Sequence, residues 1–194
     1  MRTNIYFIRH AESHSNKDPL TKAMEDCLTE VGLKQSESLA LIFKDIKIEK
    51  IFTSKVLRAK ITGTKIGGGA VDIEPTQLEY LKERKGSYSM DLTYVHSETF
   101  EDFKERLKEA KLFLENLSHK HVVVVSHAIF LKGLISYIML EDSLTEDLLI
   151  KMDNTLVIDN ASVSKFTYNQ EKQKWHIEYL NDKTHLVSVP NAVR

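Results

Sequence analysis

The chain has 194 residues, of which 42% are hydrophobic and 28% are charged, as in an ordinary globular domain of this length. Its formal net charge of −1 provides no overall attraction for nucleic acid or an anionic membrane, so we expect neither as a partner. Because Cys27 is the single cysteine and the longest later apolar run is Val122–Val125, we expect no intrachain disulfide, no membrane span and a cytoplasmic location.

The first half of the chain alternates between apolar runs that predict buried strands and amphipathic stretches that predict helices. Thr29 has the position of an N-cap, because apolar residues follow it at helical spacing. In order, we expect a strand over 4–9, a charged loop with a short helix over 12–28, the helix after Thr29, a strand over 48–53, a helix over 55–66 and a short strand over 71–73. The glycines 67–69 predict the end of the helix over 55–66. Residues 76–97 have few apolar side chains and predict a loop.

The second half predicts two helices, a central strand and a final hairpin. The stretch 99–118 is amphipathic, with Phe103, Leu107 and Leu114 on its apolar face. A continuous run of valines over 122–125 predicts a strand that is buried on both faces. After these we expect a helix over 130–139 and two strands, over 161–168 and 175–180, joined by a loop over 169–172.

The order of these elements predicts the fold class. Strands that alternate with helices as far as residue 140 indicate an α/β fold, a three-layer sandwich whose mostly parallel central sheet is covered by helices on both faces. The final hairpin adds antiparallel strands at an edge. The chain shows no linker, repeat or change of composition, so we expect residues 1–194 to form a single domain.

Polar residues follow three of the predicted strands. Arg9 and His10 come at the end of the first strand, Ser54 and then Arg58 follow the second, and His127 follows the valine run. In open α/β sheets the ligand crevice lies outside the carboxyl ends of the strands, so we expect these side chains to meet there. Two arginines and two histidines at one edge of a sheet suit a phosphate dianion.

These residue types permit phosphoryl transfer. Neutral imidazole is a good nucleophile toward phosphorus, so His10 is a candidate for covalent catalysis. Arg9 and Arg58 would disfavour the protonated ring and bind the phosphoryl oxygens, and His127 would add a donor. The leaving oxygen needs a proton from a carboxyl group, whose pKa a nearby phosphate would raise. The candidates for this acid are Glu12, Glu74, Glu79 and Glu83.

Several segments together form an ordered pattern. They are Arg9-His10-Ala11-Glu12-Ser13 with Asn16, Leu28-Thr29-Glu30-Val31-Gly32-Leu33-Lys34-Gln35, Thr53-Ser54-Lys55-Val56-Leu57-Arg58-Ala59, Leu81-Lys82-Glu83, Val124-Val125-Ser126-His127-Ala128 and Asn160-Ala161-Ser162. This pattern resembles the motifs of the histidine phosphatase superfamily, in its phosphoglycerate-mutase-like branch, over about residues 3–165. Ala11 and Ala128 stand where that family usually has glycine.

The resemblance implies a role for each matched residue. His10 would be the phosphorylated nucleophile, and Glu83 would donate the proton and later activate water. The residues implied to hold the phosphoryl group are Arg9, Arg58, His127 and Asn16, and those implied to lie near the substrate are Glu12, Ser13 and Asn160. The family needs no metal and no cofactor, and the sequence contains no motif with metal-ligand spacing.

We therefore expect a metal-independent phosphomonoester hydrolase of the histidine acid phosphatase type, with a small phosphorylated substrate or inorganic phosphate as its ligand. Two alternatives are a phosphoglycerate-type mutase and a catalytically weak relative that binds a phosphorylated ligand or a protein. The short segment of 44 positions from Glu83 to His127 favours hydrolysis, because mutases of the family usually carry a longer insertion there. In the non-catalytic interpretation, Arg58 is a surface ion-pair residue and Glu83 part of a solvated charge run. An oligomer is compatible with the sequence, which contains nothing that supports one.

Overall fold

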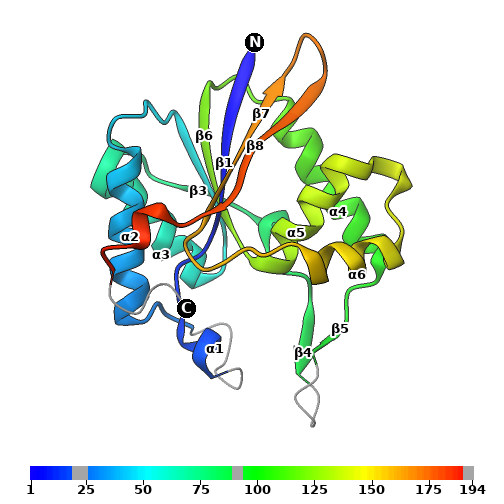
Figure 1. Ribbon diagram of the computed structural model, residues 1–194, viewed down its shortest axis with the longest axis horizontal. Helices are drawn as coiled ribbons and strands as arrows, with labels where there is room; N and C mark the ends of the chain where they lie inside the picture. The colour runs from blue at the N-terminus through cyan, green and yellow to red at the C-terminus, as the bar shows by residue number, and fades with distance from the viewer. Residues whose placement is uncertain (19–25, 89–93, 190–194) are drawn as a thin grey trace.

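The computed structural model describes residues 1–18, 26–88 and 94–189, and its centre is a six-stranded sheet (Figure 1). The spatial order of the strands is β3-β2-β6-β1-β7-β8. Their bounds are β1 Arg2–Arg9, β2 Lys50–Ser54, β3 Thr76–Leu78, β6 His121–Ser126, β7 Val163–Asn169 and β8 Lys174–Asp182. The first four strands of the spatial order are parallel, and β7 and β8 run antiparallel at one edge. The predicted fold class is therefore confirmed.

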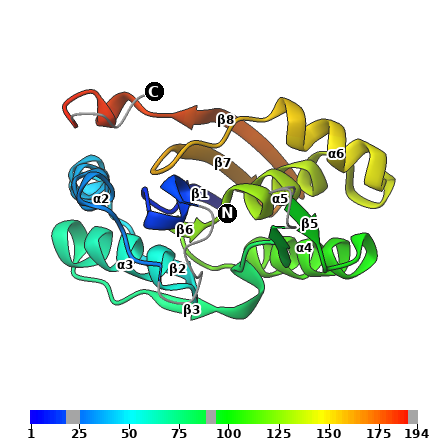
Figure 2. The ribbon, with the colours of Figure 1, turned by 90° about the horizontal axis from the view of Figure 1, so that it is seen from below.

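The sheet buries alternate residues of its central strands in two separate cores. Ile5 and Phe7 of β1 face one core, and Tyr6 and Ile8 face the other. The valines of β6 divide in the same way, which explains why this strand is apolar throughout. Figure 2 shows the two helical layers that cover these faces. Helices α2 Glu30–Phe43 and α3 Leu57–Ile66 lie on one side, and α4 Phe100–Glu115, α5 Ala128–Leu140 and α6 Glu146–Thr155 lie on the other.

Side-chain caps begin the two longest helices, and the one at Thr29 was predicted from the sequence. The Thr29 hydroxyl accepts a hydrogen bond from the Gly32 amide at the start of α2, and Thr99 accepts one from the Asp102 amide at the start of α4. Gly32 lies so close to the loop after β1 that a Cβ atom there would overlap the Glu12 carbonyl oxygen. The first turn of α2 therefore packs directly against the segment that follows His10.

Two predictions for the middle of the chain are wrong, and a third is confirmed in part. The α-helix ends at Ile66 as predicted, with Gly67 as its C-cap, but the chain continues in a wider π-helical turn, Gly67–Val71, until Asp72 adopts a left-handed conformation with φ 52°. The short strand expected over 71–73 lies instead at Thr76–Leu78. The expected loop over 76–97 contains this strand, a 3-10 turn at Glu79–Leu81 and a small hairpin of β4 Gly86–Tyr88 and β5 Tyr94–His96.

Two further segments bear on the site. The short helix α1, His14–Lys17, lies within the expected loop over 12–28, and residues 19–25 of that loop lie outside the described residues. Helix α6 was not predicted, although Thr145 caps it through the Leu148 amide. Within the described ranges, the structure contains no helix both long enough and apolar enough to cross a membrane.

Candidate active site

Two histidines and one arginine form the centre of the candidate site at the carboxyl ends of β1, β2 and β6. Arg58 donates from Nε to His10 Nε2 at 3.0 Å and from Nη2 to His127 Nδ1 at 3.1 Å. The two imidazole rings lie 5.1 Å apart. The parallel register places Arg9 beside Ser126, and the His10 amide donates to the Ser126 carbonyl. Adjacent parallel strands therefore bring together the histidines that follow them.

The partners of each ring determine its tautomer. His10 Nδ1 lies 2.8 Å from the Ala11 carbonyl oxygen, which can only accept, so Nδ1 carries the proton. His10 Nε2 consequently holds the lone pair that accepts from Arg58. His127 is bonded in the opposite sense: its Nδ1 accepts from Arg58, and its Nε2 donates to the Ser54 hydroxyl at 2.9 Å. Arg58 therefore contacts a bare nitrogen on each ring.

Both histidines are held in the neutral form. Burial, followed by the charges of His127, Arg58 and Arg9, lowers the pKa of His10 well below its ordinary 6.5. Burial, followed by the charges of Arg58, Arg9 and Arg106, lowers the pKa of His127 in the same direction. A neutral imidazole with a free lone pair is the reactive form for nucleophilic attack.

Asp26 anchors the central arginine, and sequence reasoning did not find it. Its carboxylate is fully buried and accepts from Arg58 Nη1 at 3.1 Å and from the Ser15 amide at 2.9 Å. Burial opposes ionisation of Asp26, but the hydrogen bonds from Ser15 and Ser13 and the Arg58 charge outweigh it and lower the pKa. The only signal was an acidic residue just before Leu28, within a charged stretch that predicts exposure.

Thr62 is a second site residue that the sequence did not single out. Its hydroxyl accepts from the Ala11 amide at 3.1 Å and donates to the Arg58 carbonyl at 2.8 Å, so it joins the loop after His10 to helix α3. Ala11 is completely buried and makes this contact through its backbone. The larger side chain at this position, compared with the usual glycine, is accommodated beside His10.

Arg9 lies in the same site and is oriented by a loop that follows α6. Its Nη1 donates to the Ile158 carbonyl at 2.8 Å. Its Nε is buried and has no hydrogen-bond partner among the described residues. Burial lowers the pKa of Arg9, while the carboxylates of Glu83 and Asp159 raise it. Arg9 therefore keeps one donor without a partner among the described residues, and its charge is near enough to lower the pKa of His10.

The residues implied to lie near the substrate form a network around Asn16. The Asn16 side-chain oxygen accepts from the Ser13 amide and from Asn160 Nδ2, both at 3.0 Å. Asn160 Nδ2 also donates to the His10 carbonyl at 3.0 Å, which places Asn160 and Asn16 beside His10. Ser13 is fully buried, and Glu12 is occupied by the Thr29 hydroxyl at 2.6 Å and Lys17 at 3.1 Å. Ser13 and Glu12 thus support the loop from within.

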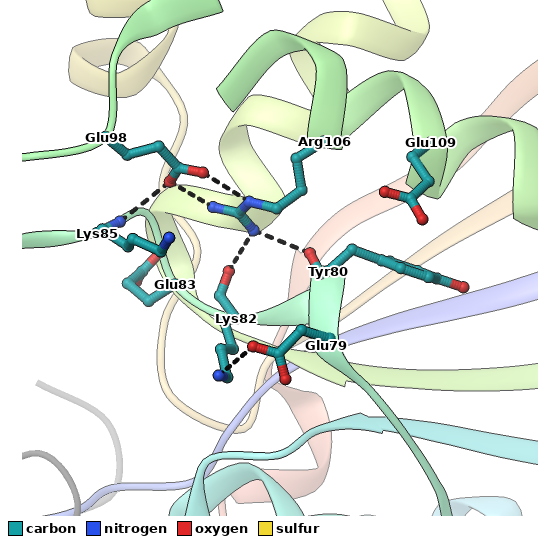
Figure 3. Close-up of a pocket in the computed structure, with 8 residues that line it drawn as sticks. All are labelled: Glu79, Tyr80, Lys82, Glu83, Lys85, Glu98, Arg106 and Glu109. Carbon is teal, nitrogen blue, oxygen red and sulfur yellow. Dashed lines mark hydrogen bonds and ion pairs between the residues drawn. The ribbon is translucent and has the colours of Figure 1, made fainter. Parts of the chain in front are cut away.

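Glu83 differs from the other acid candidates in its surroundings. Its carboxyl oxygens accept from the amides of Phe130 at 2.8 Å and Ile129 at 3.2 Å, in the first turn of the helix after His127. Burial raises its pKa, opposed by these amides, by that of Arg84 and by the Arg9 charge. By contrast, Glu74 is exposed, and Glu79 is exposed and paired with Lys55 and Lys82. Glu83 also lines a pocket of about 240 Å³, shown in Figure 3.

The described residues contain no group of three or more His, Cys, Asp or Glu side chains placed to hold a metal ion. Positive charge at the site comes instead from Arg9 and Arg58. With two neutral histidines, two guanidinium groups and one carboxyl group of raised pKa, the arrangement can bind a dianion, attack it and protonate a leaving group.

Comparisons with known proteins find similarity to phosphatases, both in sequence and in fold. The sequence profile described as histidine phosphatase superfamily (branch 1) matches residues 5–95 and 86–183. A probable fructose-2,6-bisphosphatase TIGAR A from Danio rerio is 35% identical over 57 residues, which cover 28% of this chain and only 22% of that relative.

Two solved structures illustrate the similarity in fold. A mutant phosphoserine phosphatase from Entamoeba histolytica, in complex with phosphoserine, has a TM-score of 0.73 at 19% identity and covers 95% of this chain and 100% of its own. A phosphoglycerate mutase from Bacillus anthracis str. Sterne has a TM-score of 0.72 at 18% identity and covers 95% of both chains. At these identities the likeness shows a shared fold.

Proposed function

The chain belongs to branch 1 of the histidine phosphatase superfamily, and we propose that it hydrolyses phosphomonoesters of a small metabolite through a phosphohistidine at His10. One observation carries this proposal: the proton of His10 lies on Nδ1, and the lone pair of Nε2 points at Arg58. A nucleophile for phosphorus needs such a lone pair beside a cation that can bind the phosphoryl oxygens.

In the first step, His10 Nε2 attacks phosphorus, a P–N bond forms and the P–O bond to the leaving group breaks. Arg58 Nε turns from Nε2 to a phosphoryl oxygen, and the buried Nε of Arg9 binds another. Glu83 gives its proton to the leaving oxygen, so the alcohol departs neutral and Glu83 becomes a carboxylate. The raised pKa of Glu83 favours the protonated form that this step requires.

In the second step, water attacks the phosphohistidine. The Glu83 carboxylate takes a proton from the water as the new P–O bond forms and the P–N bond breaks, so His10 regains its lone pair and inorganic phosphate leaves. The two guanidinium groups balance the phosphoryl charge in both steps, so the reaction is proposed to be independent of metal. The names of the relatives, which include a bisphosphatase and a phosphatase with bound phosphoserine, support a small phosphorylated metabolite as the substrate.

The test is hydrolysis of p-nitrophenyl phosphate and of a panel of phosphometabolites in excess chelator. We expect chelator-resistant turnover in the wild type and background rates in His10→Ala, because the covalent route is lost. His176→Ala, at an exposed histidine on β8, is the matched control and should retain full activity. Acid-labile labelling of the wild type by a radiolabelled substrate should disappear in His10→Ala.

Three outcomes would contradict the proposal. Equal turnover in the wild type and in His10→Ala would exclude a phosphohistidine at this residue. Loss of activity in chelator would show a metal-dependent reaction. Transfer of the label to a bound phosphoacid, without release of inorganic phosphate, would identify a mutase instead of a hydrolase.

A further inference from the structure

Arg106 forms hydrogen bonds to the backbone on the N-terminal side of Glu83. Its Nη1 donates to the Tyr80 carbonyl at 2.9 Å and to the Lys82 carbonyl at 2.7 Å. Arg106 lies on α4, more than 20 positions further along the chain, and its side chain is mostly buried. These two bonds therefore tie the segment that carries Glu83 to a rigid helix.

Glu98 completes the arrangement on the other side of Glu83. Arg106 donates from Nε to one carboxyl oxygen of Glu98 at 2.8 Å and from Nη2 to the other at 2.6 Å. The second oxygen also accepts from the Lys85 amide at 3.1 Å. As Figure 3 shows, the Arg106–Glu98 pair thus reaches the backbone at 80, 82 and 85, on both sides of Glu83.

Arg106 is itself held in one orientation. Its guanidinium carbon lies 5.0 Å from the ring centroid of Phe103 and 5.2 Å from that of Phe130. The amide of Phe130 is also one of the donors to the Glu83 carboxyl group. The first turn of α5 therefore contacts the Glu83 carboxyl group directly. Through the Phe130 ring it also restrains Arg106, which holds the backbone next to Glu83. Only a planar fork with five donors can make all these bonds at once, so lysine is a poor replacement.

We propose that Arg106 and Glu98 are positioning residues that hold the Glu83 carboxyl group at the leaving oxygen. This inference rests on the proposed function, because it assumes that Glu83 is the proton donor. Proton transfer requires hydrogen-bond contact with the leaving oxygen, and a displacement of about 1 Å can cost about 10²-fold in rate. The simpler explanation is that this buried ion pair only stabilises the fold.

Leaving-group dependence separates the two explanations. An alkyl phosphate needs a proton on its leaving oxygen, whereas p-nitrophenolate departs readily without one. We expect Arg106→Gln to lower kcat/KM on an alkyl phosphate by about 10- to 10²-fold, and to lower kcat/KM on p-nitrophenyl phosphate much less. The ratio kcat/KM is compared because it reports the phosphorylation of His10 and not the later attack of water, in which Glu83 acts for both esters. Glu98→Gln should shift the ratio of the two rates in the same direction, and Arg106→Lys should not restore it.

The matched control is Lys111→Met. Lys111 lies on the same helix, is similarly buried and pairs with Glu115 at 2.7 Å and Glu141 at 3.0 Å, away from Glu83. This variant should leave the ratio of alkyl to aryl rates unchanged, even where its melting temperature falls. Each variant is compared at a temperature at which it is folded, as judged by circular dichroism.

Glu83→Gln shows which proposal fails. A selective loss on the alkyl ester in Glu83→Gln, without such a loss in Arg106→Gln or Glu98→Gln, would overturn the positioning role alone. No selective loss in Glu83→Gln would overturn Glu83 as the acid, and the positioning role with it. An equal loss of kcat/KM on both esters in the Arg106 and Glu98 variants would assign the pair to fold stability.

Discussion

Replacing Asp26 by asparagine tests how the central arginine is held. The carboxylate accepts from Arg58 Nη1 and from both the amide and the hydroxyl of Ser15. The amide group of asparagine keeps one acceptor, but it removes the negative charge and leaves a guanidinium hydrogen without an acceptor. The change is isosteric, so it alters charge and hydrogen bonding with little change in volume.

The loss of unfolding free energy in Asp26→Asn can be estimated from the burial of the ion pair. The Asp26 side chain is 0% exposed and that of Arg58 is 11% exposed, so little solvent replaces the lost partner. Breaking a buried pair by removing one partner costs about 3–5 kcal/mol, and the residual access of Arg58 to solvent favours the lower end, about 3 kcal/mol. For a chain of this size that corresponds to a fall in melting temperature of about 6–12 °C. We also expect kcat to fall, by less than about 10²-fold, because Arg58 keeps its bonds to both histidines.

The contribution of Asp26 to the unfolding free energy should decrease in acid. The pKa of Asp26 is lowered from 3.8 in the folded state, so its stabilising contribution is complete above 3.8 and is lost as the pH falls below that value. The difference in unfolding free energy between wild type and Asp26→Asn should therefore be constant near neutral pH and shrink in acid. Urea unfolding at several pH values measures this difference.

The control variant is Glu37→Gln, which removes a surface pair. Glu37 lies 3.4 Å from Lys65, and both side chains are well exposed, so its loss should cost less than about 1 kcal/mol. If Asp26→Asn melts within 1 °C of the wild type and has the same kcat, the assignment of Asp26 as the anchor of Arg58 is wrong.

Two further predictions concern His10 and its surroundings. Gly32→Ala should lower the unfolding free energy by about 1–3 kcal/mol and also reduce kcat, because a methyl group there overlaps the Glu12 carbonyl and displaces the loop after His10. Gly68→Ala is the control, since a Cβ atom at Gly68 meets nothing within 4 Å, and equal stability of the two variants would refute the close approach. Because the pKa of His10 lies well below 6.5 in the folded state, the unfolded chain binds more protons below that value, and this histidine makes the fold less stable as the pH falls. Urea unfolding at pH 7, 6 and 5 should therefore show a shallower decline for His10→Gln than for the wild type, and identical slopes would contradict a buried neutral His10.

The sequence alone determined the elements that repeat a local pattern. The apolar runs that precede Arg9 and His127 form the adjacent parallel strands β1 and β6. A strand that is buried on both faces needs apolar side chains along its whole length, so such a run is recognisable in the sequence. Thr29 and Thr99 begin their helices, because a hydroxyl cap is a local contact between residues three positions apart. From these strand ends, the order of the elements predicted that the two histidines meet, since parallel strands share one carboxyl edge.

The tertiary structure alone decided which distant side chains complete the site. Asp26 and Arg58 are 32 positions apart, and a charged stretch around Asp26 predicts exposure unless its partner is known. Residue chemistry alone left Glu83 as one of four carboxyl candidates, and only the family motif singled it out. The structure adds the two amides that the first turn of α5 donates to its carboxyl group. The π-helical turn Gly67–Val71 was likewise not predicted. Gly67 lies so close to the Ile73 carbonyl that a Cβ atom there would overlap it, a contact that no local pattern encodes. Periodicity reports the burial of a segment, whereas charge pairing depends on where the fold brings segments together.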